Sequence, residues 1–160
     1  MDIVIVAQHC GSNIHGMSIR PWQYARIFAK NGHKVNVISL KYAHSRHIQP
    51  NKNIFFDNKT KAKVFYLGNF ISHNFFKKTN RLWHDIIFFF LFFIYLIKGN
   101  FKKDTIFINS MPPYLVNLIL IPYCKLRKFL IISDFRDIWF NTLREEPKLI
   151  SNFLSIISYN

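Results

Sequence analysis

The chain has 160 residues, and 22 Lys and Arg against 8 Asp and Glu give it a formal net charge of +14. This length suits one domain with a substantial core and is short for two. The charge favours anionic partners such as nucleic acid, an acidic membrane surface or a phosphorylated substrate, although the abundance of Lys, Asn, Ile and Phe is also typical of AT-rich coding DNA.

The two cysteines and the N-terminus indicate an intracellular protein. Cys10 and Cys124 are far apart in the sequence and form no metal-ligand spacing, so reduced structural thiols are expected. Asp2 stands where a secretory signal peptide has a basic residue, and the apolar run after it is too short for such a signal.

The N-terminal segment predicts a βαβ unit. Asp2–Ala7 is a short apolar run rich in β-branched residues, as in a buried strand. A polar stretch with two glycines follows. Pro21 then suits the first turn of a helix, which Gly32 ends as a C-cap, and Val35–Leu40 forms the next strand. In such a unit, the loop and the helix N-terminus lie at the carboxyl edge of the sheet, where ligands bind.

A resemblance to a known family rests on residues His15–Ser39, which read H-G-M-S-I-R-P-W-Q-Y-A-R-I-F-A-K-N-G-H-K-V-N-V-I-S. This segment resembles the start of a GT-B glycosyltransferase of the family 4 kind. The pattern of the bacterial enzymes that build cell-surface polysaccharides is close to H-G-M-x-F-R-P-x-x-L-A-R…G-H-x-V-T. The dinucleotide fingerprint G-x-G-x-x-G is absent. The resemblance implies that substrate is bound by His15, Gly16, Ser18 and Arg20.

Residues 41–67 predict a loop and a hairpin. Lys41–Asn53 is polar and basic and is expected to lie over the ligand edge. The resemblance implies that Tyr42, His44 and Arg46 in this loop face an acceptor, and a solvated loop is the alternative. Ile54–Phe56 and Lys63–Leu67 are short β-like runs joined by a polar turn.

An apolar segment with basic flanks follows. Ile86–Ile97 is wholly apolar, but as a helix it would be only about 18 Å long, too short to span a bilayer. One interpretation is a helix lying in the interface of an anionic membrane, peripheral rather than spanning. The alternative is a crossover helix buried against the sheet. Both interpretations hold if one side of the helix contacts the membrane and the other side contacts the sheet. The first interpretation assigns the membrane interface to Trp83, Phe88, Phe92 and Lys98.

A second βαβ unit is predicted near the end of the chain. Thr105–Asn109 reads as a strand, Tyr114–Lys125 as a helix and Phe129–Ser133 as the next strand. Pro122 predicts a kink or a shortened helix. Between the first strand and the helix stands S-M-P-P, where the glycosyltransferases have S-S-P-P, so Met111 departs from the family pattern.

The sequence D-F-R-D-I-W occupies Asp134–Trp139 and resembles x-x-R-D-L-W-P of the family, with Phe140 in place of proline. By this resemblance, Asp137 is the candidate general base for an acceptor hydroxyl, and Arg136 binds or orients phosphate. The alternative is an Arg–Asp ion pair that braces the loop.

These segments together predict one α/β domain of the Rossmann-like kind, with a parallel sheet and helices on both faces. The domain is expected over residues 1–145, with a tail or the start of a continuation at 146–160. The resemblance makes it the N-terminal half of a GT-B fold without the donor-binding half, whose E-x7-E pattern is not reproduced by Glu145 and Glu146.

The expected activity follows from the resemblance alone. The complete enzyme would transfer a sugar from a nucleotide-sugar to a lipid-linked acceptor in surface polysaccharide biosynthesis. It would act in the cytoplasm, on the inner face of the cell membrane, without metal or other cofactor. A separately encoded C-terminal half is a further expected partner, and the chain alone is expected to be inactive.

Two other function classes remain open. The charge would suit a nucleic-acid-binding module, but no RNP string, zinc-ligand spacing or helix-turn-helix is present, and no nucleic acid is expected. A nucleotide-binding α/β module without catalysis is the second. A dehydrogenase lacks both the glycine fingerprint and an acid at the end of the second strand.

Overall fold

A computed structural model describes residues 1–10, 19–41, 53–72, 74–75, 81–110 and 114–134. The elements, in chain order, are β1 (Asp2–Val6), α1 (Ile19–Lys30), β2 (Lys34–Leu40), β3 (Ile54–Phe56), β4 (Lys63–Leu67), α3 (Arg81–Lys98), β5 (Ile106–Ser110), α4 (Tyr114–Arg127) and β6 (Leu130–Asp134). Strands and helices alternate at both ends of the chain, as predicted.

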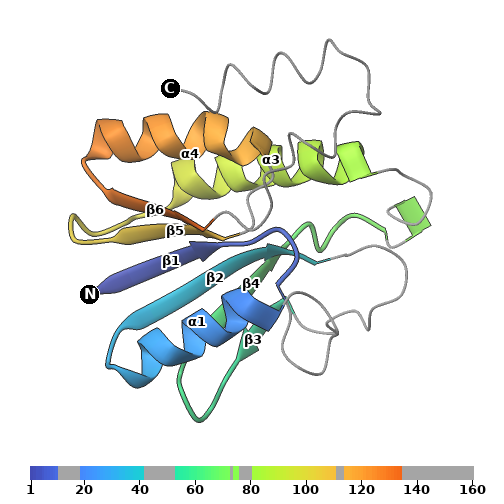
Figure 1. The fold of residues 1–160 in the computed structure, drawn as a ribbon. Coiled ribbons are helices and arrows are strands. Elements are labelled where there is room, and N and C mark those ends of the chain that lie inside the picture. Colours follow the sequence, from blue (N-terminus) through green and yellow to red (C-terminus); the bar gives the residue numbers. More distant parts are fainter. Residues whose placement is uncertain (11–18, 42–52, 73, 76–80, 111–113, 135–160) are drawn as a thin grey trace, which may run out of the picture.

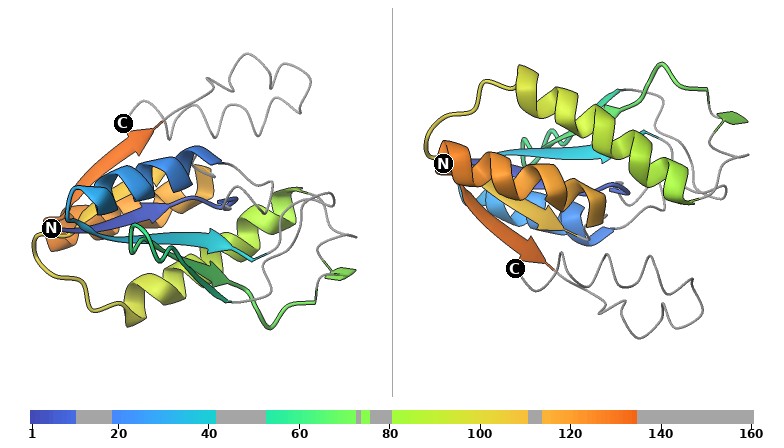
Figure 2. Two further views of the ribbon diagram at one scale, coloured as in Figure 1. Left: turned by 90° about the horizontal axis from the view of Figure 1, so that it is seen from below. Right: turned by 90° about the horizontal axis from the view of Figure 1, so that it is seen from above.

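The strands form a six-stranded sheet in the order β3-β4-β2-β1-β5-β6. All neighbours pair in parallel except β3 and β4, which form the predicted hairpin and pair antiparallel. Helix α1 covers one face of the sheet, and α3 and α4 lie together on the other (Figures 1 and 2). The predicted fold class, a Rossmann-like α/β domain with helices on both faces, is therefore confirmed.

The start and end of α1 follow the predicted signals. Pro21 lies in the first turn, where its missing N–H costs no hydrogen bond. At the other end, Gly32 has a φ of 84° and forms a Schellman motif. Its N–H donates to the carbonyl of Ala29 at 3.1 Å, and the N–H of His33 donates to that of Phe28 at 3.2 Å. The left-handed conformation explains the glycine at this position.

The sheet separates two hydrophobic clusters. The cluster under α1 is built around Trp22 and Ala25 and the sheet residues Ile3, Ile5, Val35, Val37 and Val64. The cluster under α3 and α4 is larger, and its fully buried aromatic side chains are Phe88, Phe92 and Phe107. Helix α4 is not shortened at Pro122 and runs to Arg127. Both Pro122 and Leu118 are exposed, so the Leu118 carbonyl that loses its partner can bond to water.

Helix α3 corrects part of the sequence interpretation. Phe88 and Phe92 are 0% exposed and pack against the sheet, so they cannot contact a membrane surface. Their spacing of four residues puts both on the inner side of the helix. Trp83, with 51% of its surface exposed, and Lys98 do face outward. Within the described ranges, no helix combines the length and apolarity needed to cross a bilayer.

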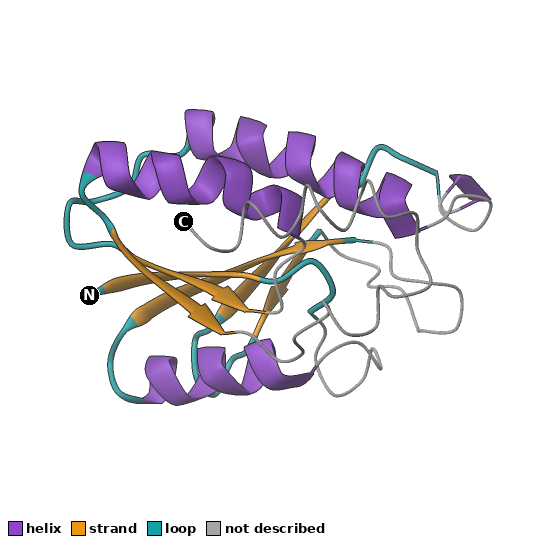
Figure 3. Ribbon diagram, turned by 45° about the horizontal axis from the view of Figure 1, so that its top comes forward, coloured by secondary structure: helices purple, strands orange, loops and turns teal. Residues whose placement is uncertain are grey.

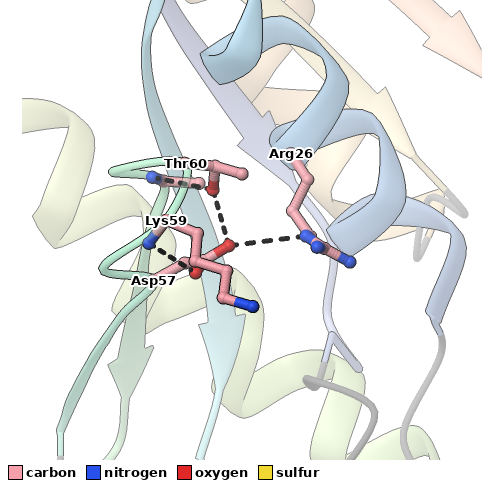
Figure 4. Close-up of polar contacts among 5 residues, drawn as sticks. Arg26, Asp57, Lys59 and Thr60 are labelled. Carbon is pink, nitrogen blue, oxygen red and sulfur yellow. Dashed lines mark hydrogen bonds and ion pairs between the residues drawn. The ribbon is translucent and has the colours of Figure 1, made fainter.

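A polar contact joins the β3–β4 hairpin to α1 (Figure 4). The Asp57 carboxylate accepts hydrogen bonds from the Thr60 hydroxyl at 2.6 Å and from the Lys59 N–H at 3.1 Å. Arg26 Nε lies 3.4 Å from the same carboxylate, as an ion pair without hydrogen-bond geometry. The Thr60 hydrogen bond is the main cause that holds the pKa of Asp57 below its ordinary value of 3.8. The charged carboxylate is therefore the form that this turn stabilises.

Replacing this carboxylate should weaken the fold modestly and change its response to acid. Asp57→Asn is expected to lower the free energy of unfolding by about 1 kcal/mol at neutral pH. Because the folded pKa lies below the unfolded one, the contribution of Asp57 is complete at neutral pH and disappears as the pH falls through the folded pKa. Urea unfolding followed by circular dichroism at pH 7 and at pH 3 should therefore show variant and wild type converging in acid. Asp104→Asn, which removes an exposed carboxylate, is the matched control. A gap between Asp57→Asn and wild type that persists undiminished in acid would contradict the assignment.

Candidate functional site

The candidate site lies at the carboxyl edge of the sheet. Parallel strands end at the same edge, and the helix that follows each strand begins there. The arrowheads of β1, β2, β5 and β6 mark this edge in Figures 1 and 3. Polar side chains collect at it on both faces of the sheet, which is the position where α/β folds bind ligands.

On the α1 side, a basic and an acidic residue from distant parts of the chain meet. Arg20, in the first turn of α1, has its Nη1 3.7 Å from Oδ1 of Asp134, the last residue of β6. The other carboxylate oxygen of Asp134 accepts a hydrogen bond from the buried Ser110 hydroxyl at 3.1 Å. Ser110 and Asp134 pair directly across β5 and β6, so the sheet register fixes this contact.

Arg20 remains accessible to a ligand. Its side chain is 40% exposed, and a single oxygen of Asp134 lies within ion-pair distance at 3.7 Å. A guanidinium has five N–H donors in a planar fork and is always charged, which suits it to phosphate oxygens. The arrangement can therefore hold a phosphate group near the ends of β5 and β6 while Asp134 keeps the guanidinium in place.

On the α3 side, Gln8 and Asp85 form a second polar contact. The Gln8 amide donates a hydrogen bond of 2.7 Å to Asp85 Oδ1, which joins the end of β1 to the first turns of α3. Gln8 still pairs with β2, because its carbonyl accepts a hydrogen bond from the Leu40 N–H at 2.9 Å. Gln8 is buried and Asp85 is half-buried, so the carboxylate has a fixed position and partial access to solvent.

Further polar residues are buried beside this contact. His84, next to Asp85 in α3, is 1% exposed. The Asn109 amide donates a short hydrogen bond to Asn117 Oδ1 of α4, and Asn109 Oδ1 has no hydrogen-bond partner among the described residues. Asn109 pairs with Val6 of β1 and therefore shares the face of Val6, which is the α3 and α4 side. Buried polar side chains thus lie below the carboxyl edge on the α3 and α4 side of the sheet.

The segment that leaves β1 is held by a buried serine. The Ser39 hydroxyl accepts a hydrogen bond from the Cys10 N–H at 2.8 Å and donates one to the Gln8 carbonyl at 3.0 Å. Burial raises the pKa of the Cys10 thiol to about 12, and that of Cys124 to the same value. Both thiols are free and buried, as predicted, and neither is a nucleophile at neutral pH.

The predicted site residues divide into those that the structure places and those outside its described residues. Arg20 lies at the carboxyl edge as predicted. His15, Gly16 and Ser18, Tyr42, His44 and Arg46, and Arg136 and Asp137 all lie outside the described residues. Arg136 and Asp137 follow Asp134 by two and three positions in the chain, so the motif that contains them continues from the strand whose end contacts Arg20.

Sequence reasoning missed four residues at this edge: Gln8, His84, Asp85 and Asp134. A faint signal existed, since Gln8 is a polar residue directly after an apolar strand and W-H-D directly precedes the apolar run of α3. Among the described residues, no three His, Cys, Asp or Glu side chains come together as ligands for a metal ion.

Comparison of the sequence with models of known protein families gives no match, and comparison with curated proteins gives none either.

Proposed function

We propose that the chain is the acceptor-side half of a GT-B glycosyltransferase of the family 4 kind. The complete enzyme would transfer a sugar from a nucleotide-sugar to a lipid-linked acceptor during assembly of a surface polysaccharide. In this proposal the protein works in the cytoplasm, peripheral on the inner face of the cell membrane, and needs no metal or other cofactor.

The observation that carries the proposal is the meeting of Arg20 and Asp134. Each belongs to one of the sequence motifs on which the family resemblance rests, H-G-M-S-I-R-P and D-F-R-D-I-W. The two motifs are far apart in the chain, yet the contact of 3.7 Å puts Arg20 at the end of the strand from which the second motif continues. Convergence at a ligand edge is what one substrate site built from both motifs requires.

The proposed chemistry assigns a role to each residue. The acceptor hydroxyl gives its proton to the Asp137 carboxylate, while its oxygen forms a bond to the anomeric carbon of the donor sugar. The bond between that carbon and the diphosphate breaks, and the nucleoside diphosphate leaves with the electron pair. Arg20 and Arg136 stabilise the negative charge that develops on the leaving phosphates.

This scheme also requires a second domain that closes the substrate site at the carboxyl edge. A carboxyl edge open to water on one side would leave the electrostatic contacts to the diphosphate weak. The family resemblance assigns donor binding to a second Rossmann-like domain, which carries the E-x7-E pattern. Such a domain would supply both the grip on the nucleotide-sugar and the exclusion of water.

A complementation experiment tests the proposal. The 160-residue chain alone should transfer no sugar to a lipid-linked acceptor and should bind a nucleotide-sugar weakly at most. Addition of a C-terminal GT-B domain that carries the paired glutamates should restore transfer, measured as labelled sugar appearing in the lipid fraction.

The C-terminal domain alone is the control and should be inactive. Turnover of a nucleotide-sugar by the 160-residue chain alone would contradict the assignment of donor binding to another domain. If no glycosyl transfer occurs with a cognate domain that binds the chain, the proposed function itself is wrong.

A further inference from the structure

Helix α3 has an apolar side that the described part of the chain leaves exposed. The exposed apolar residues recur at helical spacing between the first and last turns of the helix, which is about 27 Å long at 1.5 Å per residue. We call this the α3 outer face, and it consists of Leu82, Trp83, Phe90, Phe93, Ile94 and Ile97, all between 43% and 67% exposed. Single exposed apolar residues are ordinary on protein surfaces, whereas six on one side of a helix, three of them aromatic, indicate an interaction surface.

The neighbouring helix extends this surface. Helices α3 and α4 lie side by side on the same face of the sheet (Figure 2). On α4, Leu118 is 40% exposed and Leu126 is 83% exposed. Exposed apolar side chains are therefore present on both helices that cover this face of the sheet.

A cluster of cations adjoins this surface. Both helices run toward the amino edge of the sheet, where β5 and β6 begin, so their last turns and the segments that follow lie at one end of the domain. We call this group the basic end: Lys98, Lys102, Lys103, Lys125, Arg127 and Lys128, all exposed. Among the described residues, the acidic ones there are Asp104, in the same segment, and Asp2, 3.8 Å from Lys102. Helix dipoles favour cations in the last turns, but they do not account for Lys102 and Lys103 beyond the helix.

We infer that the α3 outer face and the basic end form one docking surface for an anionic lipid bilayer. The helix lies in the plane of the membrane, with its aromatic and aliphatic side chains at the boundary between headgroups and acyl chains. The cations of the basic end contact anionic headgroups. The inference builds on the membrane location in the proposed function, but it needs neither a donor nor catalysis.

The charge pattern favours a bilayer over a second copy of the chain as occupant. The α3 outer face carries no acidic residue. Two copies paired through it in parallel would bring their basic ends together, and pairing in the antiparallel sense would leave both basic ends without counter-charges. An anionic membrane satisfies the apolar face and the cations at the same time.

Vesicle binding of the full chain tests the inference. The probes are vesicles of phosphatidylcholine alone and vesicles of phosphatidylcholine mixed with phosphatidylglycerol, each at low and at high salt. Wild-type protein should float with the mixed vesicles, more strongly at low salt, and bind little to phosphatidylcholine alone. The variant Lys98→Gln, Lys102→Gln, Lys103→Gln should lose roughly 100-fold in affinity for the mixed vesicles.

Two further variants distinguish binding through this surface from a general effect of positive charge. Lys30→Gln, Lys59→Gln, Lys61→Gln removes the same charge from exposed positions in α1 and the β3–β4 turn and should bind nearly as well as wild type. Phe90→Ser, Phe93→Ser, Ile97→Ser should abolish flotation while circular dichroism shows a retained fold. Equal loss in both lysine variants would overturn the inference, and so would undiminished flotation of the serine variant. A dimer in analytical ultracentrifugation that the serine changes dissociate, with no vesicle binding by wild type, would assign the face to a second copy instead.

Discussion

Phe88→Ala is expected to lower the free energy of unfolding by about 3–5 kcal/mol. Phe88 is 0% exposed and its ring stacks on that of Phe92 with 6.0 Å between centroids. Both belong to the cluster that joins α3 and α4 to the sheet. Truncation removes the transfer free energy of the ring and leaves a cavity that the neighbouring strands cannot fill. Because the total free energy of unfolding of a single domain is about 5–15 kcal/mol, this one change should remove a large part of the stability.

The same helix offers a matched control. Phe90, two residues further along, is 58% exposed. Phe90→Ala should change the free energy of unfolding by about 0.5 kcal/mol or less, because little surface is buried there. Urea titrations of both variants, followed by circular dichroism, give the two values. A small effect for Phe88→Ala and a large one for Phe90→Ala would mean that the helix is rotated, and it would restore the prediction that Phe88 and Phe92 face a membrane.

The error at Phe88 and Phe92 has a physical cause. Most helices reveal their buried side because polar residues mark the opposite side. From Ile86 to Ile97 every residue of α3 is apolar, so this stretch has no polar side to compare with. The sequence predicts a helix there, but the choice between Phe88 and Phe90 as the buried ring depends on how the helix sits on the sheet.

Local signals predicted most of the fold. Gly32 after a helical pattern and Pro21 at its start correctly placed the ends of α1. The strand β6 was also predicted, but not its place at the edge of the sheet, where Leu130 and Ile132 remain exposed. An apolar run looks the same in a central strand and in an edge strand, since the difference lies in what the rest of the chain places beside it.

Contacts between distant residues account for what was missed at the site. The order β2-β1-β5-β6 brings Arg20 to Asp134, and the packing of α3 brings Asp85 to Gln8. In both pairs the two residues are far apart in the sequence and have no fixed spacing, so no sequence motif contains either pair. Family resemblance led to Arg20 because it belongs to a local string of matches. The resemblance did not indicate Asp134 at the start of D-F-R-D-I-W, because the family pattern specifies no residue type at that position.

In a reconstituted enzyme, Asp137→Asn is expected to lower kcat about 10²–10⁴-fold, the usual contribution of a general base. The change keeps the size of the side chain and removes its capacity to take a proton. Steady-state rates of sugar transfer, with donor and acceptor both saturating, measure the effect. The free energy of unfolding should stay within about 0.5 kcal/mol of wild type. A large loss of stability with a modest loss of rate would instead support an ion pair with Arg136 that braces the loop.

Asp85→Asn is the comparison that makes this result specific, because Asp85 is a further carboxylate at the carboxyl edge, on the opposite face of the sheet from Asp134. The Gln8 amide donates to Asp85 Oδ1 at 2.7 Å, and an asparagine oxygen at the same position can still accept that hydrogen bond. The variant should therefore keep its fold and lose little of kcat if Asp137 is the base. If Asp85→Asn loses 10²-fold or more while Asp137→Asn does not, the base is the carboxylate on α3. The acceptor would then bind on the α3 side of the sheet, near Gln8, and not beside Arg20.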